Sequence, residues 1–251
     1  MVKALIIGQR KSGTTWLYEN FKKEHLINVS EKVKESNFFS SEKLSIKEYH
    51  QLFSKKMGVS IEVDTSIISY PNAINRIKEY NPEMRIIIIL REPVDYLFSR
   101  INHSYRKNEL KYNSNMEIQE FFKENNWLLN EIELSHVERF KENFETLLIP
   151  YNDLKTDAGK VYNTIINFIL SPKKVNAKPT IIEPINKGRQ SRLPIITRFY
   201  TDFAKHLRQK GYHSIVNIFK ESPIRKLIES RNPVELFSKN EINSYLKLYK
   251  K

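Results

Sequence analysis

Apolar and polar positions along the first two thirds of the chain follow two alternating patterns. Short unbroken apolar runs, rich in β-branched residues, are typical of strands buried in a parallel sheet. Five such strands are predicted at Lys3–Gly8, Leu26–Val29, Val59–Val63, Arg85–Leu90 and Thr146–Tyr151. Segments with helical spacing of apolar residues fill the gaps, at Ile46–Lys56, Pro71–Tyr80, Pro93–Lys107, Trp127–Asn143 and Lys155–Ile169. This alternation predicts an α/β fold with a central parallel β-sheet flanked by helices.

The pattern changes near Leu193, where amphipathic helical segments replace the alternation. Three are predicted, at Ile195–Gln209, Tyr212–Lys220 and Lys239–Tyr249. We therefore expect a single domain over residues 1–251, with an α/β core over 1–190 and a basic helical C-terminal extension packed on it over 191–251. Because these segments are basic as well as amphipathic, weak association with a membrane surface is the alternative use of their apolar faces.

Length and composition narrow the class of protein. With 251 residues, of which 40% are hydrophobic and 12% aromatic, the chain can bury one sizeable core. It has no cysteine, which excludes disulfides and thiolate metal sites, and no spacing of His or carboxylates predicts a structural metal. No stretch approaches the roughly 18 apolar residues of a membrane span, and the first strand begins at once. We expect a soluble, cytoplasmic protein without a transmembrane segment.

The net charge of +13 is unevenly distributed. Residues 186–251 contain 15 Lys and Arg against 5 Asp and Glu, whereas residues 1–185 contain 27 against 24. A strongly basic last quarter favours an anionic partner, such as an acidic glycan. Specific nucleic-acid binding is not expected, because the chain has no helix-turn-helix, zinc or base-stacking signature.

The loop after the first strand has the composition of a phosphate site. Gly8 and Gly13 allow the backbone to turn tightly and approach an anion. Thr14 and Thr15 then present hydroxyls and free backbone amides at the positive end of the next helix, and Lys11 adds a full charge. A Walker A loop would have its Lys directly after the second Gly. Here the Lys comes two residues before it, so the ATP/Mg signature is missing.

Two further segments should reach the same edge of the sheet. Arg91 ends the fourth strand, and Ser99 lies almost two turns into the helix opened by Pro93, with His103 one turn further on. Ligands of open parallel sheets bind outside the carboxyl ends of the strands, which is where Arg91 falls. Glu35 follows the second strand and is directed to the same crevice. By composition alone, its segment would be an exposed polar turn.

Three of these segments together resemble the sulfotransferases that use 3′-phosphoadenylyl sulfate (PAPS) as donor. Gly8–Trp16 (GQRKSGTTW) resembles their 5′-phosphosulfate loop, and Arg91–Ser99 (REPVDYLFS) resembles their 3′-phosphate-binding segment. Lys34–Phe39 (KESNFF) is similar to the K-E-x-x-F-F segment of the heparan-sulfate-type (glycan) sulfotransferases. The resemblance therefore implies a P-loop-like domain that binds PAPS and releases adenosine 3′,5′-diphosphate (PAP).

The resemblance also implies roles for individual residues. Glu35 would be the general base, Lys11 would stabilise charge on the leaving group, and His103 is a candidate auxiliary acid or base. The residues implied in donor binding are Arg10, Lys11, Ser12, Gly13, Thr14, Thr15, Trp16, Arg91, Ser99, Lys187, Gly188 and Arg189. The last three form a basic loop similar to the K-G-R loop that closes over the nucleotide in the family.

Two shorter resemblances are less specific. The family commonly has Glu-Asp-Leu after the last core strand, whereas this chain has Tyr151-Asn152-Asp153-Leu154, so Tyr151 and Asp153 are given a structural role only. Asp64-Thr65-Ser66 resembles a stretch where family members place polar residues that support the site or the acceptor. A turn at the end of a strand would choose the same residue types.

The function implied is in-line transfer of a sulfuryl group from PAPS to a hydroxyl or amine, with no metal. The acceptor would be a glycan or another small molecule, anionic or otherwise polar. Two alternatives stay open at this point. One is a P-loop nucleotide or small-molecule kinase, which would need an acidic metal ligand such as Asp64. The other is a non-catalytic polyanion-binding protein on a sulfotransferase fold.

Overall fold

A five-stranded parallel sheet organises the first part of the computed structural model. The model describes residues 1–41, 43–53, 57–107, 109–181, 183, 190–191, 229–230 and 235–249. The strands are β1 (Ala4–Gly8), β2 (Ile27–Asn28), β3 (Val59–Val63), β4 (Arg85–Leu90) and β5 (Thr146–Pro150). Their order is β2-β3-β1-β4-β5, with every pairing parallel. The predicted α/β fold with a central parallel sheet is therefore confirmed.

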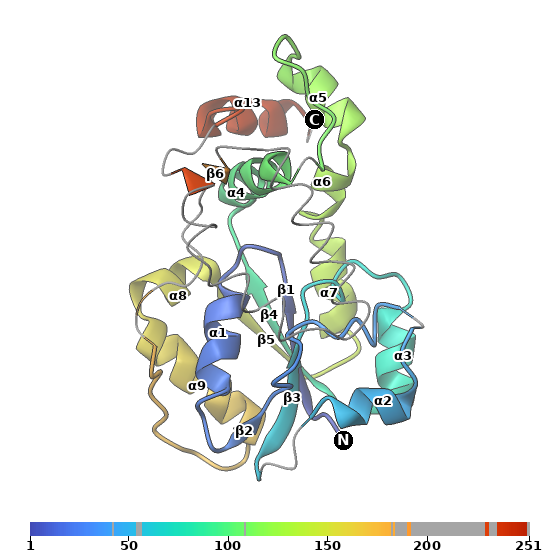
Figure 1. The fold of residues 1–251 in the computed structure, drawn as a ribbon, viewed down its shortest axis with the longest axis vertical. Helices are drawn as coiled ribbons and strands as arrows, with labels where there is room; N and C mark the ends of the chain where they lie inside the picture. Colours follow the sequence, from blue (N-terminus) through green and yellow to red (C-terminus); the bar gives the residue numbers. More distant parts are fainter. Residues whose placement is uncertain are drawn as a thin grey trace. The chain divides into compact units, whose positions relative to one another are not determined.

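Alternating side chains of the central strands supply two hydrophobic cores. Ala4 and Ile6 of β1 face the core that includes α1 (Thr14–Phe21) and α9 (Ala158–Leu170), whereas Leu5 and Ile7 face the opposite core. The second core lies against α2 (Ile46–Gln51), α3 (Ala73–Tyr80) and α7 (Ser135–Lys141). Figure 1 shows these two groups of helices on opposite faces of the sheet. Both faces are covered, which explains the continuous apolar runs of β1 and β4.

The helices differ from the predicted ones mainly at their ends. The segment predicted as one helix over Trp127–Asn143 is two, α6 (Trp127–Asn130) and α7. At the end of α6, the carbonyl oxygen of Asn130 is hydrogen-bonded to Nε2 of His136 at 3.1 Å. Tyr151, predicted to end the last strand, begins the short helix α8 (Tyr151–Thr156), and α5 (Ile118–Glu124) was not predicted.

The contacts divide the chain into two compact units. The first comprises residues 1–96 and 129–186, and the second comprises residues 97–128 and 187–251. The sheet belongs to the first unit, and helix α4 (Pro93–Arg106) runs from the first into the second. The prediction of a single domain, with an extension that starts at residue 191, stays a prediction.

Aromatic packing stabilises the second unit. Phe122 of α5 stacks on Tyr245 of α13 (Lys239–Tyr249), with ring centroids 4.4 Å apart, and Phe121 lies 4.9 Å from Phe237. Helix α13 has the predicted bounds. A short antiparallel pair, β6 (Gln190–Ser191) and β7 (Glu229–Ser230), is also described. The other two predicted C-terminal helices lie outside the described residues.

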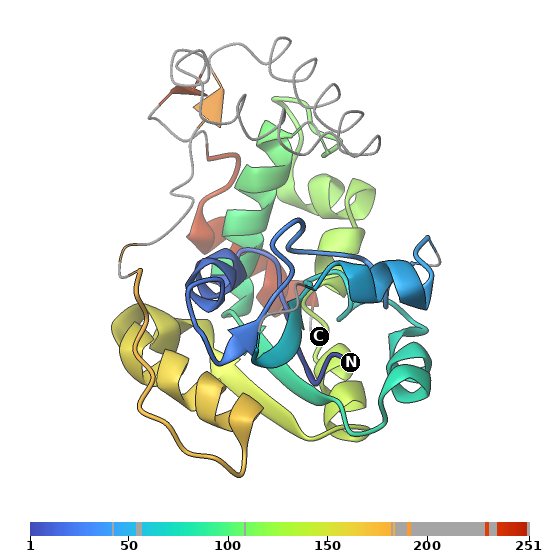
Figure 2. The ribbon, with the colours of Figure 1, turned by 60° about the horizontal axis from the view of Figure 1, so that its bottom comes forward.

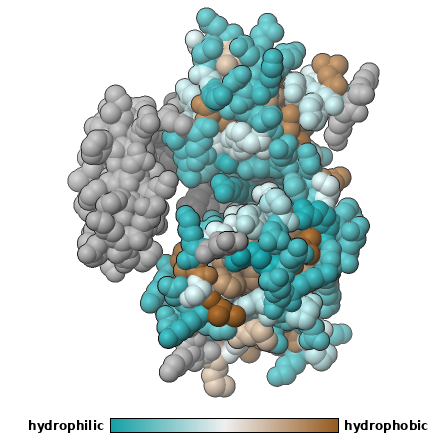
Figure 3. All heavy atoms as spheres, turned by 90° about the vertical axis from the view of Figure 1, so that its right-hand side faces the viewer, coloured by the Kyte–Doolittle hydropathy of each residue, from teal (hydrophilic) through white to brown (hydrophobic). Residues whose placement is uncertain are grey.

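Polar residues dominate the coloured part of the face drawn in Figure 3, where apolar residues form separate groups. A second view of the ribbon shows α1 and α9 together beside the sheet, with α2 and α3 on its other side (Figure 2). In the described part of the chain, no helix combines the length and the apolar character needed to cross a bilayer.

Candidate functional site

The loop between β1 and α1 has the conformation that its glycines predicted. Gly8, Lys11 and Gly13 all have positive φ, of 139°, 66° and 82°. At Gly8 a Cβ atom would lie 2.6 Å from the carbonyl oxygen of Ile89, so this position admits only glycine. Ser12 is fully buried, and its hydroxyl donates a hydrogen bond to the carbonyl of Gln9. The Ser12 side chain therefore closes the loop on its own backbone.

Helix α1 begins without a side-chain cap. Its N-cap residue is Gly13, which has no side chain to accept from the first amides of the helix. The Gly13 carbonyl accepts from the amides of Trp16, at 2.9 Å, and Leu17, at 3.2 Å. The amides at the very start of the helix therefore have no side-chain cap, and such amides form an anion site together with the helix dipole.

Arg91 lies against this loop, as the sequence predicted. Its Nη1 donates to the carbonyl of Lys11 at 3.2 Å, and its guanidinium carbon lies 4.9 Å from the centre of the Tyr151 ring. Its backbone amide donates to Oε1 of Gln9 at 2.8 Å. The Nε atom of Arg91 is buried and has no hydrogen-bond partner among the described residues. A buried donor without a partner at a phosphate-type loop fits an anionic ligand.

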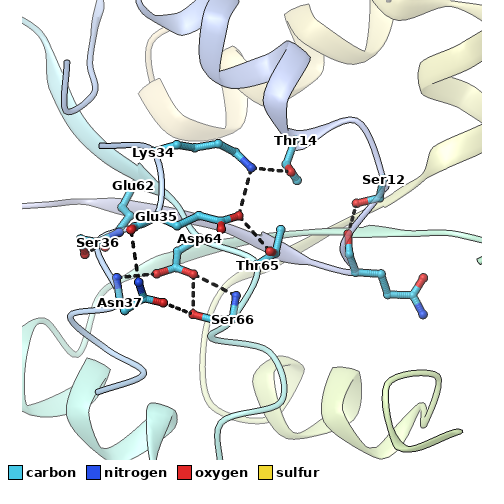
Figure 4. Close-up of polar contacts among 11 residues, drawn as sticks. Ser12, Thr14, Lys34, Glu35, Ser36, Asn37, Glu62, Asp64, Thr65 and Ser66 are labelled. Carbon is cyan, nitrogen blue, oxygen red and sulfur yellow. Dashed lines mark hydrogen bonds and ion pairs between the residues drawn. The ribbon is translucent and has the colours of Figure 1, made fainter. Parts of the chain in front are cut away.

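Lys34 joins the Glu35 segment to the phosphate loop (Figure 4). Its Nζ donates to Oγ1 of Thr14 at 3.0 Å and to Oε1 of Glu35 at 3.1 Å. The same Glu35 oxygen accepts from Oγ1 of Thr65 at 2.9 Å. Residues 14, 35 and 65 come from three separate strand ends, so the structure brings the predicted base beside the predicted donor loop.

Two buried carboxylates of β3 and its continuation hold the backbone next to Glu35. Glu62 accepts from the amide and the hydroxyl of Ser36, with the amide nitrogen at 3.0 Å. Asp64 accepts from the amide of Asn37 at 2.9 Å and from the amide of Ser66 at 2.9 Å. Both carboxylates are almost completely shielded from solvent. They fix the turn that carries Glu35 without contacting its carboxyl group.

Aromatic packing fixes the other end of this segment. Phe38 stacks on Tyr49 with ring centroids 4.0 Å apart, and Phe39 lies edge-on to Tyr49 at 5.6 Å. All three belong to the core under α2 and α3. The two apolar residues that follow the polar turn thus anchor it to the core, while Glu35 remains half-exposed.

The electrostatic surroundings of the three carboxylates differ. Burial raises the pKa of Glu35, but the ammonium of Lys34, the hydroxyl of Thr65 and the charge of Arg10 outweigh it, and the pKa is lower than usual. Burial, with the nearby charge of Asp64, raises the pKa of Glu62 to about 7. Burial also raises the pKa of Asp64. Glu35 is therefore ionised at neutral pH, and Glu62 is poised to take up a proton there.

Comparison with known proteins decides the family. The family model described as "Sulfotransferase domain" matches residues 2–226. The chain belongs to the sulfotransferase domain family. The enzyme class expected from the resemblance, a PAPS-dependent sulfotransferase, is thereby confirmed.

One solved sulfotransferase structure shows the same fold, and two others align with lower scores. A sulfotransferase from Alicyclobacillus acidocaldarius aligns with a TM-score of 0.59 at 18% identity, over 86% of this chain and 96% of that one. Mouse sulfotransferase SULT7A1, solved in complex with PAP, aligns with a TM-score of 0.46 at 21% identity, over 70% and 60%. The sulfotransferase domain of the curacin biosynthetic pathway gives 0.45 at 14% identity, over 74% and 80%. The search of curated proteins finds no match.

Among the predicted site residues of this sulfotransferase domain, one has its side chain in the core and five others stay predictions. Trp16 is packed in the core, where its ring lies 6.1 Å from that of Tyr162 and its Nε1 donates to the carbonyl of Ile181 at 2.8 Å. Ser99 and His103 lie on the part of α4 that belongs to the second unit, so their approach to the donor stays a prediction. Lys187, Gly188 and Arg189 lie outside the described residues.

Sequence reasoning missed two residues that shape the site. Gln9 accepts from the amide of Arg91 and donates from Nε2 to the carbonyl of Glu131 at 3.4 Å, so it ties the loop to two other segments. Tyr151 was given a structural role, and its ring supports both the Arg91 guanidinium and Gly13. A Gln inside a Gly-rich loop gives no signal by itself, because its partners are distant in the sequence.

Proposed function

We propose that this sulfotransferase domain transfers the sulfuryl group of PAPS to a hydroxyl or amine, with Glu35 as the general base. The observation that carries the proposal is the bridge made by Lys34, which contacts Thr14 of the loop and Glu35 at once. The group that would accept the proton and the loop that would hold the donor are thus neighbours. A general base must lie within hydrogen-bond reach of the reacting group, and this arrangement supports that geometry.

The residues around the loop suit a nucleotide that carries phosphate groups at its 3′ and 5′ positions. The amides at the start of α1, with Thr14 and Thr15, would hold the 5′-phosphosulfate, and Lys11 would stabilise charge developing on the leaving oxygen. Arg91 would bind the 3′-phosphate, for which the buried and unpartnered Nε and its cation–π support on Tyr151 pre-organise the guanidinium. PAPS supplies the sulfuryl group and leaves as PAP.

The charge state of Glu35 supports its role. Because its pKa is lowered, the carboxyl is ionised across neutral pH and needs no prior deprotonation. The same lowering makes it a weak base, so we expect proton transfer to accompany formation of the new bond to sulfur rather than to precede it.

The alternative of a P-loop kinase gains no support from Asp64. The oxygens of this buried carboxylate accept from the amide of Asn37 and from the amide and hydroxyl of Ser66, which suits a structural role. In the described part of the chain, no three His, Asp or Glu side chains gather as they would around a metal ion. The glycan-type acceptor rests on the Lys34–Phe39 motif and on the basic charge of residues 186–251, most of which lie outside the described residues. The proposed acceptor is therefore stated as a hydroxyl or amine.

Replacing Glu35 by Gln tests the proposal. Glu35→Gln should lower the turnover of PAPS with acceptor by at least 100-fold, while PAP binds within about threefold of wild type, because Lys34 still reaches Thr14. Glu83→Gln, which removes an exposed glutamate, is the matched control and should leave both quantities unchanged. Near-normal turnover by Glu35→Gln would remove Glu35 as the base and favour the non-catalytic polyanion-binding alternative.

A further inference from the structure

A cavity of about 80 Å³ opens beside the phosphate loop. The loop residues Gln9 and Arg10 form one wall, and the turn after β3, with Thr65 and Ser66, forms another. Thr65 is also the hydrogen-bond partner of Glu35, so the cavity shares a wall residue with the proposed base. A single water needs roughly 10–15 Å³ of such space. The cavity therefore has room for several non-hydrogen atoms of a bound molecule.

The third wall carries polar groups that the donor site does not use. Tyr96 donates from its hydroxyl to Oε2 of Glu131 at 2.5 Å, and His136 lies beside them. Gln9 holds the backbone of Glu131 through its carbonyl, so this wall is connected directly to the phosphate loop. A charged carboxylate and an imidazole in one small cavity are an unusual lining for a purely structural void.

The ring of His136 presents a hydrogen-bond acceptor that has no donor among the described residues. Its Nε2 lies 3.1 Å from the carbonyl of Asn130, which can only accept, so Nε2 carries the proton in the neutral ring. Nδ1 is then a hydrogen-bond acceptor. It is buried and has no partner among the described residues. Buried acceptors are normally paired, so the missing donor is expected from a bound molecule.

We infer that this cavity holds the acceptor, and that the acceptor is a small polar molecule, or the small polar end of a larger one, that donates hydrogen bonds from hydroxyl or amine groups. The inference rests on the proposed sulfuryl transfer, because that reaction requires an acceptor beside Glu35. His136 Nδ1 and the Glu131 carboxylate both accept hydrogen bonds. Polyols, sugars and amino alcohols offer several donors to such a lining, whereas a simple phenol or sterol offers one hydroxyl on an apolar body.

The test measures acceptor kinetics and donor binding separately. Wild-type enzyme with PAPS is assayed for PAP release with polyols, simple sugars, amino alcohols, phenols and sterols. For the best acceptor, Glu131→Gln and His136→Ala should each raise KM at least about tenfold, with the Kd of PAP within threefold of wild type. Glu131→Gln is nearly isosteric and can still accept from Tyr96, so it is the variant that should certainly fold. Glu133→Gln, an exposed neighbour, is the control and should change nothing.

Each outcome decides the inference. A larger loss for amines than for polyols in Glu131→Gln would identify the amine as the group that pairs with this carboxylate. Unchanged acceptor KM in both variants, or turnover confined to phenols and sterols, would overturn the inference. If PAP binds but no polar acceptor is sulfated, the inference also falls, although the donor site stands. Absence of PAP binding would instead overturn the proposed function, and the inference with it.

Discussion

At the scale of single residues, the site is built on carboxylates with different tasks. Glu35 is half-exposed and is held ionised by Lys34 and Thr65. Glu62 and Asp64 are buried, and they hold the backbone on which Glu35 sits. Their burial is costly, because an ionised carboxylate loses hydration that only partners can replace. Ionisation of Glu62 therefore destabilises the folded protein, although the same side chain fixes the backbone that carries the proposed base.

This cost predicts an unusual dependence of stability on pH. The pKa of Glu62 is about 7 in the folded protein against 4.5 ordinarily, so the folded state binds more protons between these values. The contribution of this group to stability is complete below pH 4.5 and is lost as the pH rises through about 7. Glu62→Gln should remove that loss and raise the free energy of unfolding at pH 8 by about 3 kcal/mol.

Urea denaturation of wild type and Glu62→Gln at pH 5 and pH 8 measures this effect. The neutral amide can still accept from Ser36 and can donate to the hydroxyl of Tyr49, which lies 2.6 Å from Glu62 in the wild type. Glu48→Gln, an exposed capping residue, is a control for charge removal on α2. A variant less stable than wild type at pH 8 would contradict the account of Glu62.

Lys34 should hold the pKa of Glu35 below its usual value. Replacing it by Met removes the charge and the hydrogen bond that lower the pKa of Glu35, while desolvation by burial remains. Lys34→Met should therefore move the titration of the Glu35 carboxyl to higher pH, which a ¹³C NMR titration measures. Lys32→Met removes an exposed lysine two residues away and should leave the titration in place. An unshifted titration in Lys34→Met would show that Lys34 does not hold Glu35 ionised.

At the scale of elements, the phosphate loop depends on helix α8 packing beneath it. A Cβ atom at Gly13 would lie 2.6 Å from Cδ2 of Leu154 and 3.3 Å from the Tyr151 ring. The loop, α8 and the Arg91 guanidinium on Tyr151 therefore form one packed group. This explains why Tyr151, given only a structural role at the sequence level, matters to the donor site.

Gly13→Ala should damage both stability and donor binding. The left-handed backbone at φ 82° costs an L-residue about 1–2 kcal/mol, and the contact with Leu154 adds to this. We expect the free energy of unfolding to fall by about 2 kcal/mol and the affinity for PAP to fall with it. Gly159→Ala is the matched control, because its nearest contact is 3.7 Å away inside α9, and it should stabilise by up to about 1 kcal/mol. Equal melting temperatures for the two variants would contradict the role of the loop conformation.

The strands could be predicted from the sequence more completely than the helices. Continuous apolar runs such as Arg85–Leu90 are typical of buried strands, and all five strands begin and end within one residue of the predicted positions. The break between α6 and α7 could not be predicted, because residues 130–135 contain no Gly or Pro to mark it. The Glu35 segment could be placed at the sheet edge, but its lowered pKa depends on Lys34 and Thr65 meeting it in space.

At the scale of the whole molecule, the division into two units was not predicted. Residues 97–128 belong to the same unit as the C-terminal segment, with contacts such as that of Phe122 with Tyr245. Contacts between residues so far apart cannot be predicted from the local sequence pattern. The basic charge of residues 186–251 lies mostly outside the described residues, so its role toward an anionic acceptor stays a prediction. The cytoplasmic location and the absence of a metal also stay predictions.

The most direct test of the donor site is a calorimetric titration with PAP, 5′-AMP and ATP/Mg, on wild type and on Arg91→Ala. Arg139→Ala is the matched control, since its guanidinium also donates to a backbone carbonyl, that of Pro71 at 2.6 Å. We predict that PAP binds far more tightly than either other ligand, that Arg91→Ala loses at least about tenfold of this affinity, and that the control does not. Equal binding of PAP and 5′-AMP, a preference for ATP/Mg, or an unaffected Arg91→Ala would contradict the account.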